Sequence, residues 1–148
     1  MPRHFPSFLS VLFLIGPFAL APADAWASPE EDRDGARAAI GHYFEGHATG
    51  DASHMRKAFL STAHIEGIRE GKFTSWSLDE YCARFTGEAA PDENARVRTI
   101  DVIDVSGNSG MARATLTHGK TVFTDYFVLL KVDDEWRIAN KVYYGRAN

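Results

Sequence analysis

Apolar residues recur with the period of an α-helix in two stretches of the first half of the chain. Residues 28–31 read Ser-Pro-Glu-Glu, which is a capping box with proline in the first turn, so a helix can begin there. Asp34 is a second possible N-cap of the same helix. The apolar face of this helix is formed by Ala36, Ala39, Ile40, Tyr43, Phe44 and His47. Gly50 ends it, and Asp51 caps a short second helix that runs to Phe59.

From His64 to Trp76 the pattern changes to two short apolar runs separated by Glu70-Gly71, which predicts a β-hairpin. Residues 77–80, Ser-Leu-Asp-Glu, form a second capping box, and Trp76 can pack onto Tyr81 as a hydrophobic staple. We therefore expect a third helix at this point. Its apolar face consists of Leu78, Tyr81, Cys82 and Phe85. Residues 87–95 read as a loop.

The last third of the chain alternates between apolar and polar positions, as half-buried strands do. The expected strands are Arg96–Ser106, Met111–Thr117, Thr121–Val132 and Glu135–Tyr144, joined by short turns. Sequential strands with short connections predict an antiparallel meander. The whole order is two helices, a hairpin, a helix and four strands, which predicts one α+β domain with its helices on one face of the sheet.

The N-terminal residues 1–27 have the pattern of a secretory signal peptide. Arg3 and His4 precede an apolar stretch that is shorter than a membrane span, and Ala25-Trp26-Ala27 offers a small-residue cleavage site. We expect cleavage after Ala27, a mature domain over residues 28–148, and export to the periplasm or the medium. The alternatives are a retained membrane anchor and a misread start site. Since no second long apolar run follows, no membrane span is expected after removal of the signal.

Charge and cysteine content exclude several classes of function. The chain has 16 Lys and Arg against 20 Asp and Glu, a net charge of −4, so we predict no nucleic-acid partner. The single cysteine, Cys82, cannot form an internal disulfide, and we expect it to be a buried small apolar residue. None of the histidines forms the i, i+4 pair that binds zinc from one helix face, so no metal site and no cofactor are predicted.

Asp125 is the first candidate for chemistry, because it interrupts the apolar strand from Val122 to Leu130. Strand alternation places it on the same face as Phe123 and Phe127. If that face lines a pocket, burial makes Asp125 a candidate general base or hydrogen-bond acceptor. An ion pair with Lys141, or a position facing solvent, is the structural alternative.

Two neighbouring residues of the last strand, Asn140 and Lys141, are further candidates for ligand contact. Strict alternation puts Asn140 on the packed face together with Trp136 and Ile138, and puts Lys141 on the outer face. A buried Asn140 needs partners for its amide group, which Asp125 or a ligand could supply.

Three segments resemble the NTF2-like superfamily, and the resemblance covers residues 34–146. They are Tyr43–Asp51 (YFEGHATGD), Phe123–Phe127 (FTDYF) and Trp136–Val142 (WRIANKV), the last of which is similar to the closing strand of the branch labelled putative lumazine-binding. The resemblance implies a strongly curved sheet wrapped around three helices as a cone, with a pocket between them. It also implies a homodimer that forms through the outer face of the sheet. Because members of the superfamily include both enzymes and binding modules, the resemblance does not select a reaction.

We expect the cone to bind a small, largely apolar ligand. The expected contacts are Tyr43, His47, Phe59, Trp76, Tyr81, Phe85, Phe123, Phe127, Asn140 and Lys141. The alternatives are an isomerase or dehydratase, in which Asp125 is the base and Tyr43 or His64 stabilises the oxyanion, and a catalytically silent dimerisation module. A cavity of about 300 Å³ or more that contains the Asp125 carboxylate favours either of the first two readings, whereas a filled cone favours the third.

Overall fold

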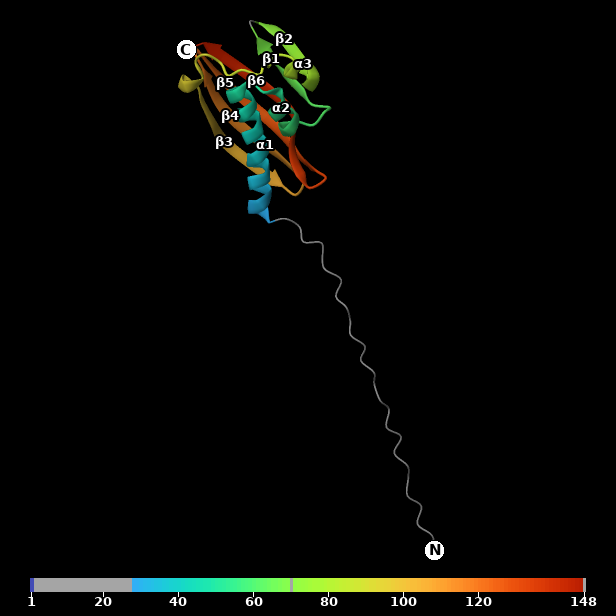
Figure 1. Ribbon diagram of the computed structural model, residues 1–148. Coiled ribbons are helices and arrows are strands. Elements are labelled where there is room, and N and C mark those ends of the chain that lie inside the picture. The colour runs from blue at the N-terminus through green and yellow to red at the C-terminus, as the bar shows by residue number, and fades with distance from the viewer. Residues whose placement is uncertain (2–27, 70, 148) are drawn as a thin grey trace.

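The computed structural model describes residue 1, residues 28–69 and residues 71–147 (Figure 1). The expected signal peptide lies, except for its first residue, outside the described residues. The helices are α1 (Pro29–Thr49), α2 (Ala52–Ala58) and α3 (Leu78–Cys82), with a short 3₁₀ turn η1 (Glu93–Ala95). The strands are β1 (His64–Arg69), β2 (Lys72–Ser77), β3 (Val97–Ser106), β4 (Ser109–His118), β5 (Thr121–Val132) and β6 (Glu135–Ala147).

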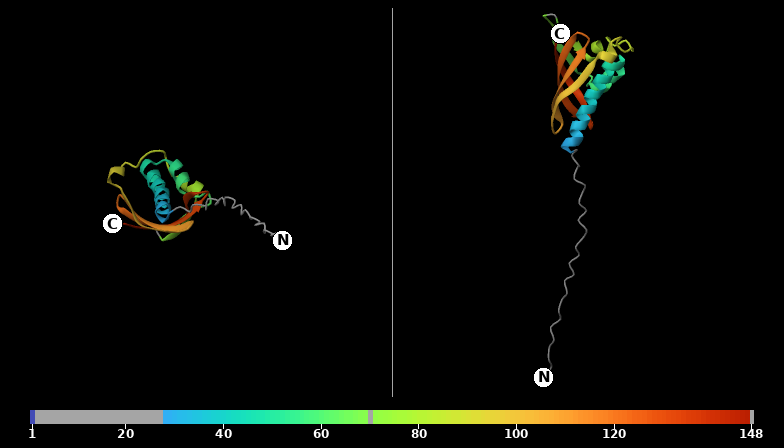
Figure 2. Two further views of the ribbon diagram at one scale, coloured as in Figure 1. Left: turned by 90° about the horizontal axis from the view of Figure 1, so that it is seen from below. Right: turned by 90° about the vertical axis from the view of Figure 1, so that its left-hand side faces the viewer.

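The six strands form one curved sheet in the order β2-β1-β6-β5-β4-β3. Strands β3 to β6 form the expected antiparallel meander, and β1 and β2 form the expected hairpin. The hairpin joins the sheet because β1 pairs in parallel with β6, from Ile65 opposite Lys141 to Ile68 opposite Tyr144. Figure 2 shows the helices lying along the concave face of this sheet. The α+β cone expected from the sequence is confirmed.

Local capping sets the starts of the helices. Ser28 caps α1 through a reciprocal capping box with Glu31, so the helix begins there rather than at Asp34. Position 35 of α1 needs glycine, because a Cβ there would collide with the indole ring of Trp136. Gly50 ends the helix in the left-handed conformation, with a φ of 72°.

Helix α3 is shorter than the sequence predicts. Ser77 and Glu80 form the expected capping box, but the helix ends at Cys82 instead of continuing to Phe85. After Cys82 the chain tightens into 3₁₀-type turns, in which the Arg84 and Phe85 amides donate to the carbonyls three residues earlier. Phe85 still packs against the core from this turn.

Alternation along β6 breaks at Ala139, which corrects the expected facing of Asn140 and Lys141. Leu129 pairs with Ile138, but the preceding residue of β5 pairs with Asn140, so β6 contains one extra residue in a β-bulge. The bulge reverses the alternation of the side chains beyond it. Lys141 is therefore buried, whereas Val142 is 46% exposed on the outer face.

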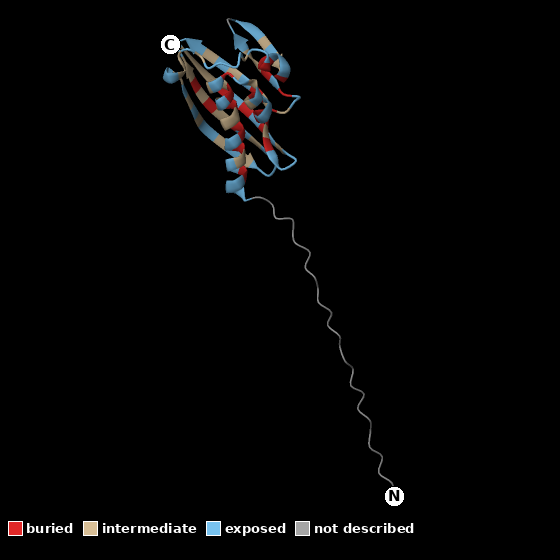
Figure 3. Cartoon of the chain, viewed as in Figure 1, coloured by how far each residue is buried: buried red, intermediate tan, exposed pale blue. Residues whose placement is uncertain are grey.

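The core lies between α1, α2 and the concave face of the sheet, where buried residues concentrate (Figure 3). It includes Cys82, whose predicted burial is confirmed at 4% exposure. Trp76 stacks on Tyr81 with a ring-centroid distance of 6.4 Å, which agrees with the expected staple. In the part of the chain that the structure describes, no helix is long and apolar enough to cross a membrane.

Candidate functional site

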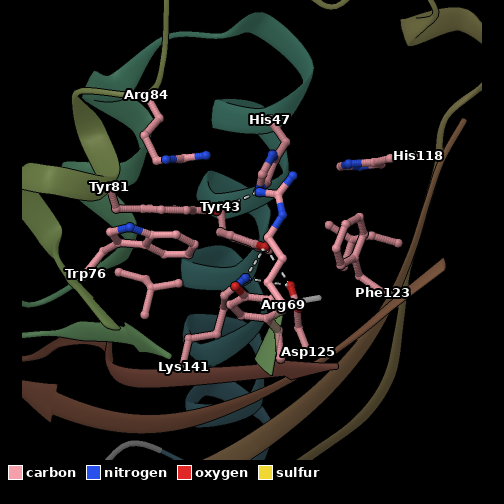
Figure 4. A pocket seen from close by; sticks show the side chains of 13 residues that line it. Tyr43, His47, Arg69, Trp76, Tyr81, Arg84, His118, Phe123, Asp125 and Lys141 are labelled. Atoms are coloured by element: carbon pink, nitrogen blue, oxygen red, sulfur yellow. Dashed lines mark hydrogen bonds and ion pairs between the residues drawn. The ribbon is translucent and has the colours of Figure 1, made fainter. Parts of the chain in front are cut away.

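A cavity of about 160 Å³ remains between α1, α3 and the upper half of the sheet (Figure 4). We call it the cone cavity. Its walls are Tyr43, His47, Ile65, Arg69, Trp76, Tyr81, Arg84, Leu116, His118, Phe123, Asp125, Lys141 and Tyr143. It is smaller than the volume of about 300 Å³ expected above for a ligand-binding or catalytic cone, but it is not filled, and it is close in volume to engineered protein cavities of about 150 Å³ that bind benzene.

Three buried side chains meet on the floor of the cone cavity. The Tyr43 hydroxyl donates to Oδ2 of Asp125 at 2.5 Å. The Lys141 ammonium donates to the Tyr43 hydroxyl at 2.7 Å and to the same Asp125 oxygen at 3.0 Å. The ion pair with Lys141 and the position in a pocket wall, which the sequence offered as alternatives for Asp125, therefore occur together, and the chemical role of the carboxylate stays a prediction.

We call Tyr43, Asp125 and Lys141 the floor triad, and burial shifts the pKa values of Tyr43 and Lys141. Burial raises the pKa of Tyr43 well above its usual value, and the negative charge of Asp125 raises it further, so Tyr43 remains a neutral donor. Burial also lowers the pKa of Lys141, while the Asp125 carboxylate opposes that shift. The Lys141 ammonium lies 4.8 Å from the centroid of the Tyr43 ring and 5.2 Å from that of Tyr143, so aromatic faces add to its stabilisation.

Two polar atoms on residues that line the cavity are buried without a hydrogen-bond partner among the described residues. They are Oδ1 of Asp125 and Nε2 of His118. Asp125 is only 1% exposed, and a buried polar atom left unpaired costs about 1 to 3 kcal/mol. A molecule inside the cone cavity could supply the missing partners.

The two histidines of the cavity are held in the neutral form. Burial lowers the pKa of His118 to about 4, and the nearby Arg98 and Arg96 contribute to this shift. Burial also lowers the pKa of His47 well below its usual value, and the positive charge of Lys141 lowers it further. His47 interacts through Nε2 with the Tyr81 hydroxyl at 3.0 Å, which ties α1 to α3 above the cavity.

The structure brings together seven of the residues expected to form the site. These are Tyr43, His47, Trp76, Tyr81, Phe123, Asp125 and Lys141. Phe59 and Phe127 instead lie in the core behind Tyr43, with ring-centroid distances to it of 5.9 Å and 5.3 Å. Phe85 lies beyond His47 and lines an adjoining surface depression, which shares His47, Tyr81 and Arg84 with the cone cavity.

His64 and Asn140 do not reach the cone cavity. His64 is exposed at the start of β1, and Oδ1 of Asn140 accepts a hydrogen bond from the His64 backbone amide at 2.8 Å. The Asn140 amide also donates to Glu66 at 3.4 Å. Its polar groups therefore help to hold β1 against β6, and the expectation that Asn140 reaches the pocket is wrong because of the bulge at Ala139.

Sequence reasoning missed six residues of the cavity wall, namely Ile65, Arg69, Arg84, Leu116, His118 and Tyr143. Alternation along β4 contained the signal for His118, because it lies in phase with the buried Ala112, Ala114 and Leu116. Tyr143 is in phase with Lys141, which alternation had placed on the outer face. For Arg69 and Arg84 the sequence contains no comparable signal, because both are exposed residues at the ends of elements.

The cone cavity has space for a small molecule beside the carboxylate of Asp125. No group of three or more potential ligands lies close enough to hold a metal ion in the described ranges 28–69 and 71–147. Asp125 can accept a hydrogen bond through Oδ1 while Tyr43 and Lys141 donate to its Oδ2.

Comparison with known proteins agrees with this architecture. The family described as "Putative lumazine-binding" matches residues 31–144. The chain is similar to an NTF2-like protein of unknown function from Shewanella baltica, with a TM-score of 0.73 and 25% identity, over 82% of this chain and 99% of that one. A similar protein from Methylobacillus flagellatus gives a TM-score of 0.70 and 28% identity, over 82% of this chain and 96% of that one.

A ketosteroid isomerase-like protein from Erwinia carotovora shares the fold, with a TM-score of 0.60 and 14% identity over 80% of this chain and 98% of that one. No curated protein matches the chain. The match over residues 31–144 and the shared cone architecture lead to one assignment: the chain belongs to the putative lumazine-binding family of the NTF2-like superfamily.

Proposed function

We propose that this protein binds a small organic molecule in the cone cavity. The observation that supports this proposal most directly is a pair of buried atoms without a hydrogen-bond partner among the described residues, Oδ1 of Asp125 and Nε2 of His118, on two residues that line a cavity of about 160 Å³. Buried polar atoms in folded proteins are nearly always satisfied, and exceptions at a cavity wall mark where a bound partner would lie.

The cavity wall defines the ligand in outline. Aromatic rings from four different elements, those of Trp76, Tyr81, Phe123 and Tyr143, favour a flat apolar body. Asp125 offers an acceptor at the floor, so the ligand should carry a hydroxyl or amino group at that end. The volume suits a single ring with one or two substituents.

A cavity-filling substitution tests this proposal. Ile65 is fully buried on the cavity wall, whereas Ile68 lies on the same strand and is 56% exposed. Ile65→Phe places extra volume in the cavity and should abolish binding of small aromatic molecules, while Ile68→Phe should leave binding unchanged. Native mass spectrometry and ligand-induced thermal shifts would measure this. Equal binding by the wild-type and Ile65→Phe proteins would exclude the cone cavity as the binding site.

A second candidate function is that of an isomerase or dehydratase in which Asp125 removes a proton. It is favoured by Oδ1 of Asp125, which has no hydrogen-bond partner within the described ranges, while Tyr43 and Lys141 engage Oδ2. Since His64 lies outside the cavity, only Tyr43 of the two expected oxyanion-stabilising residues remains beside Asp125. Asp125→Asn should then abolish turnover of an identified substrate and spare its binding, whereas loss of binding alone would assign Asp125 to recognition.

The outer face of the sheet supports a further part of the proposal, a homodimer. Apolar side chains exposed there include Val102, Met111, Tyr126, Val128, Leu130, Val142 and Tyr144. Exposed apolar residues gathered on one face of a sheet are typical of an interaction surface. Sedimentation should give a dimer for the wild-type chain and a monomer for Val128→Asp. A catalytically silent dimerisation module would form the dimer but show no binding in the cone cavity.

We also propose that the protein is exported with cleavage after Ala27. The support is the signal pattern of residues 1–27. N-terminal sequencing of protein recovered from the periplasm or the medium should begin at Ser28, and full-length protein confined to the cytoplasm would refute this.

A further inference from the structure

Two arginines, Arg69 and Arg84, line the mouth of the cone cavity. Arg69 is the last residue of β1, and Arg84 lies in the turn after α3. In Figure 4 the Arg69 side chain extends through the space between Trp76 and His118, and the Arg84 side chain lies above Tyr81 and Trp76. The Arg84 guanidinium carbon lies 4.8 Å from the centroid of the Trp76 ring, so a stacking contact orients this group over the aromatic wall.

Neither arginine forms an ion pair with any residue that the structure describes, although nearby arginines do. Arg96 pairs with Asp92 at 2.9 Å, and Arg98 pairs with Glu93 at 2.6 Å. A guanidinium that faces a cavity without a carboxylate partner is available to an anion from outside the chain.

The balance of charge on the cavity wall is positive. Asp125 and Lys141 neutralise each other within the floor triad. Burial keeps the pKa values of His47 and His118 low, so both are neutral at neutral pH. Among the described residues of the wall, Arg69 and Arg84 then leave two positive charges without a carboxylate partner at the mouth, in a chain whose net charge is −4. A field of this sign, confined to one cavity, selects an anionic ligand there.

We propose that the ligand of the cone cavity is a small planar carboxylate, bound with its anionic group between Arg69 and Arg84 and its hydrogen-bond donor at Asp125. This inference rests on the proposed function. A carboxylate matches the planar fork of a guanidinium and can lie in the plane of an aromatic ring. The ring would lie between the rings of the cavity wall, and the donor group would reach the free Oδ1 of Asp125.

A pair of matched probes tests the charge requirement. Both 4-hydroxybenzoate and 4-hydroxybenzamide have about ten non-hydrogen atoms, a size at which millimolar to micromolar binding is attainable. They share the ring and the hydroxyl donor and differ in the charge of the other end. Titrations of the full chain, followed by chemical shifts of the cavity residues, should show at least roughly tenfold tighter binding of the carboxylate, and its advantage should decrease as salt concentration increases.

Variants assign that preference to the two arginines. Arg84→Gln and Arg69→Gln should each weaken 4-hydroxybenzoate binding by roughly three- to tenfold and change 4-hydroxybenzamide binding less than about twofold. Arg37→Gln is the control, because Arg37 is exposed on α1 and does not line the cavity. It should leave the affinities of both probes unchanged.

The outcomes separate this inference from the function on which it rests. Equal binding of the two probes, or equal weakening of both in the arginine variants, would overturn the carboxylate assignment and retain a ligand cavity. If neither probe shifts the resonances of the cavity residues at millimolar concentration, the carboxylate assignment fails. If, in addition, neutral aromatic molecules do not distinguish the wild-type protein from Ile65→Phe, the proposed function fails as well.

Discussion

The two ends of the cone interior contain the same three kinds of group in different surroundings. At the end near the start of α1, Asp32 accepts hydrogen bonds from Lys131 at 3.0 Å and from the Trp136 indole at 3.2 Å. At the other end, Asp125 accepts from Lys141 and from Tyr43. We call the Asp32–Lys131–Trp136 group the closed triad. Each group thus joins a carboxylate, an ammonium and an aromatic donor.

The closed triad and the floor triad differ in how far they are buried and in whether a buried carboxylate oxygen lacks a partner among the described residues. The closed triad is partly exposed, with side-chain exposures of 13% for Asp32 and 20% for Lys131, and the Trp136 ring fills the space above Gly35. In the floor triad, the side chain of Asp125 is 1% exposed and that of Lys141 is 5% exposed, yet Oδ1 of Asp125 has no partner among the described residues. Among the described residues, the same chemistry therefore leaves no buried unpartnered oxygen in the closed triad at the protein surface, but leaves one in the floor triad beside the cone cavity.

Replacing the lysine of each triad should give the largest difference in the free energy of unfolding between the two triads. Lys141→Met leaves a buried carboxylate without its counter-charge and should lower the free energy of unfolding by about 3 to 5 kcal/mol, measured by urea denaturation. Lys131→Met is the matched control, and its effect should be clearly smaller because solvent screens the closed triad.

The triple variant Tyr43→Phe, Asp125→Leu, Lys141→Met should recover most of the stability lost in Lys141→Met, because no unpaired charge remains. Its binding of small aromatic molecules should still be weakened. If Lys141→Met and Lys131→Met lose equal stability, the contrast in burial between the two triads does not determine their energetics.

A pair of glycine substitutions in α1 should show that the closed end is packed. Alanine is favoured over glycine within a helix by about 1 kcal/mol, so Gly41→Ala, whose Cβ meets nothing within 4 Å, should raise stability by about 0.5 to 1 kcal/mol. Gly35→Ala would collide with the Trp136 ring and should instead lower stability by about 1 to 3 kcal/mol. Chemical denaturation of the two variants would measure this, and stabilisation by Gly35→Ala would show that Trp136 moves aside freely.

The two ends should also respond to acid in different pH ranges. The pKa of His118 is lowered from 6.5 to about 4, so between these values the unfolded chain binds a proton that the folded chain does not. Stability should therefore decrease as pH falls through this range, and His118→Gln should remove its part of the decrease. The hydrogen bond from Lys131 lowers the pKa of Asp32 below 3.8. The stability that Asp32 contributes to the fold is therefore fully present above pH 3.8 and is lost only as the pH falls below that value.

Thermal unfolding at a series of pH values would measure both ranges. An unchanged profile in His118→Gln would mean that the imidazole is protonated as easily in the folded as in the unfolded protein.

Elements with local signals were predictable in this chain. The capping residues Ser28, Asp51 and Ser77 occupy the positions that the sequence predicted, because a cap bonds to backbone amides within three residues. The meander was predictable for the same reason, since its turns join strands that are adjacent in sequence. The end of α3 was not, because its last turn tightens without a glycine or proline to mark it.

The candidate site was only partly predictable. Asp125 and Tyr43 stood out because a carboxylate interrupts an apolar strand and a tyrosine lies on an apolar helix face. Lys141 was assigned to the wrong face, since one extra residue in β6 reverses the alternation. The arginines at the mouth come from the end of β1 and from the turn after α3, and no periodic pattern relates them.

By itself, the sequence determined the helices, their caps, the meander and the buried cysteine, because these follow from hydrogen bonds and apolar periodicity within a few residues of the chain. Only the tertiary structure decided which polar groups share the cone cavity. The parallel pairing of β1 with β6 and the bulge at Ala139 bring Arg69, Asp125 and Lys141 to one space. Such contacts join residues far apart along the chain, and their geometry depends on the register and curvature of the whole sheet.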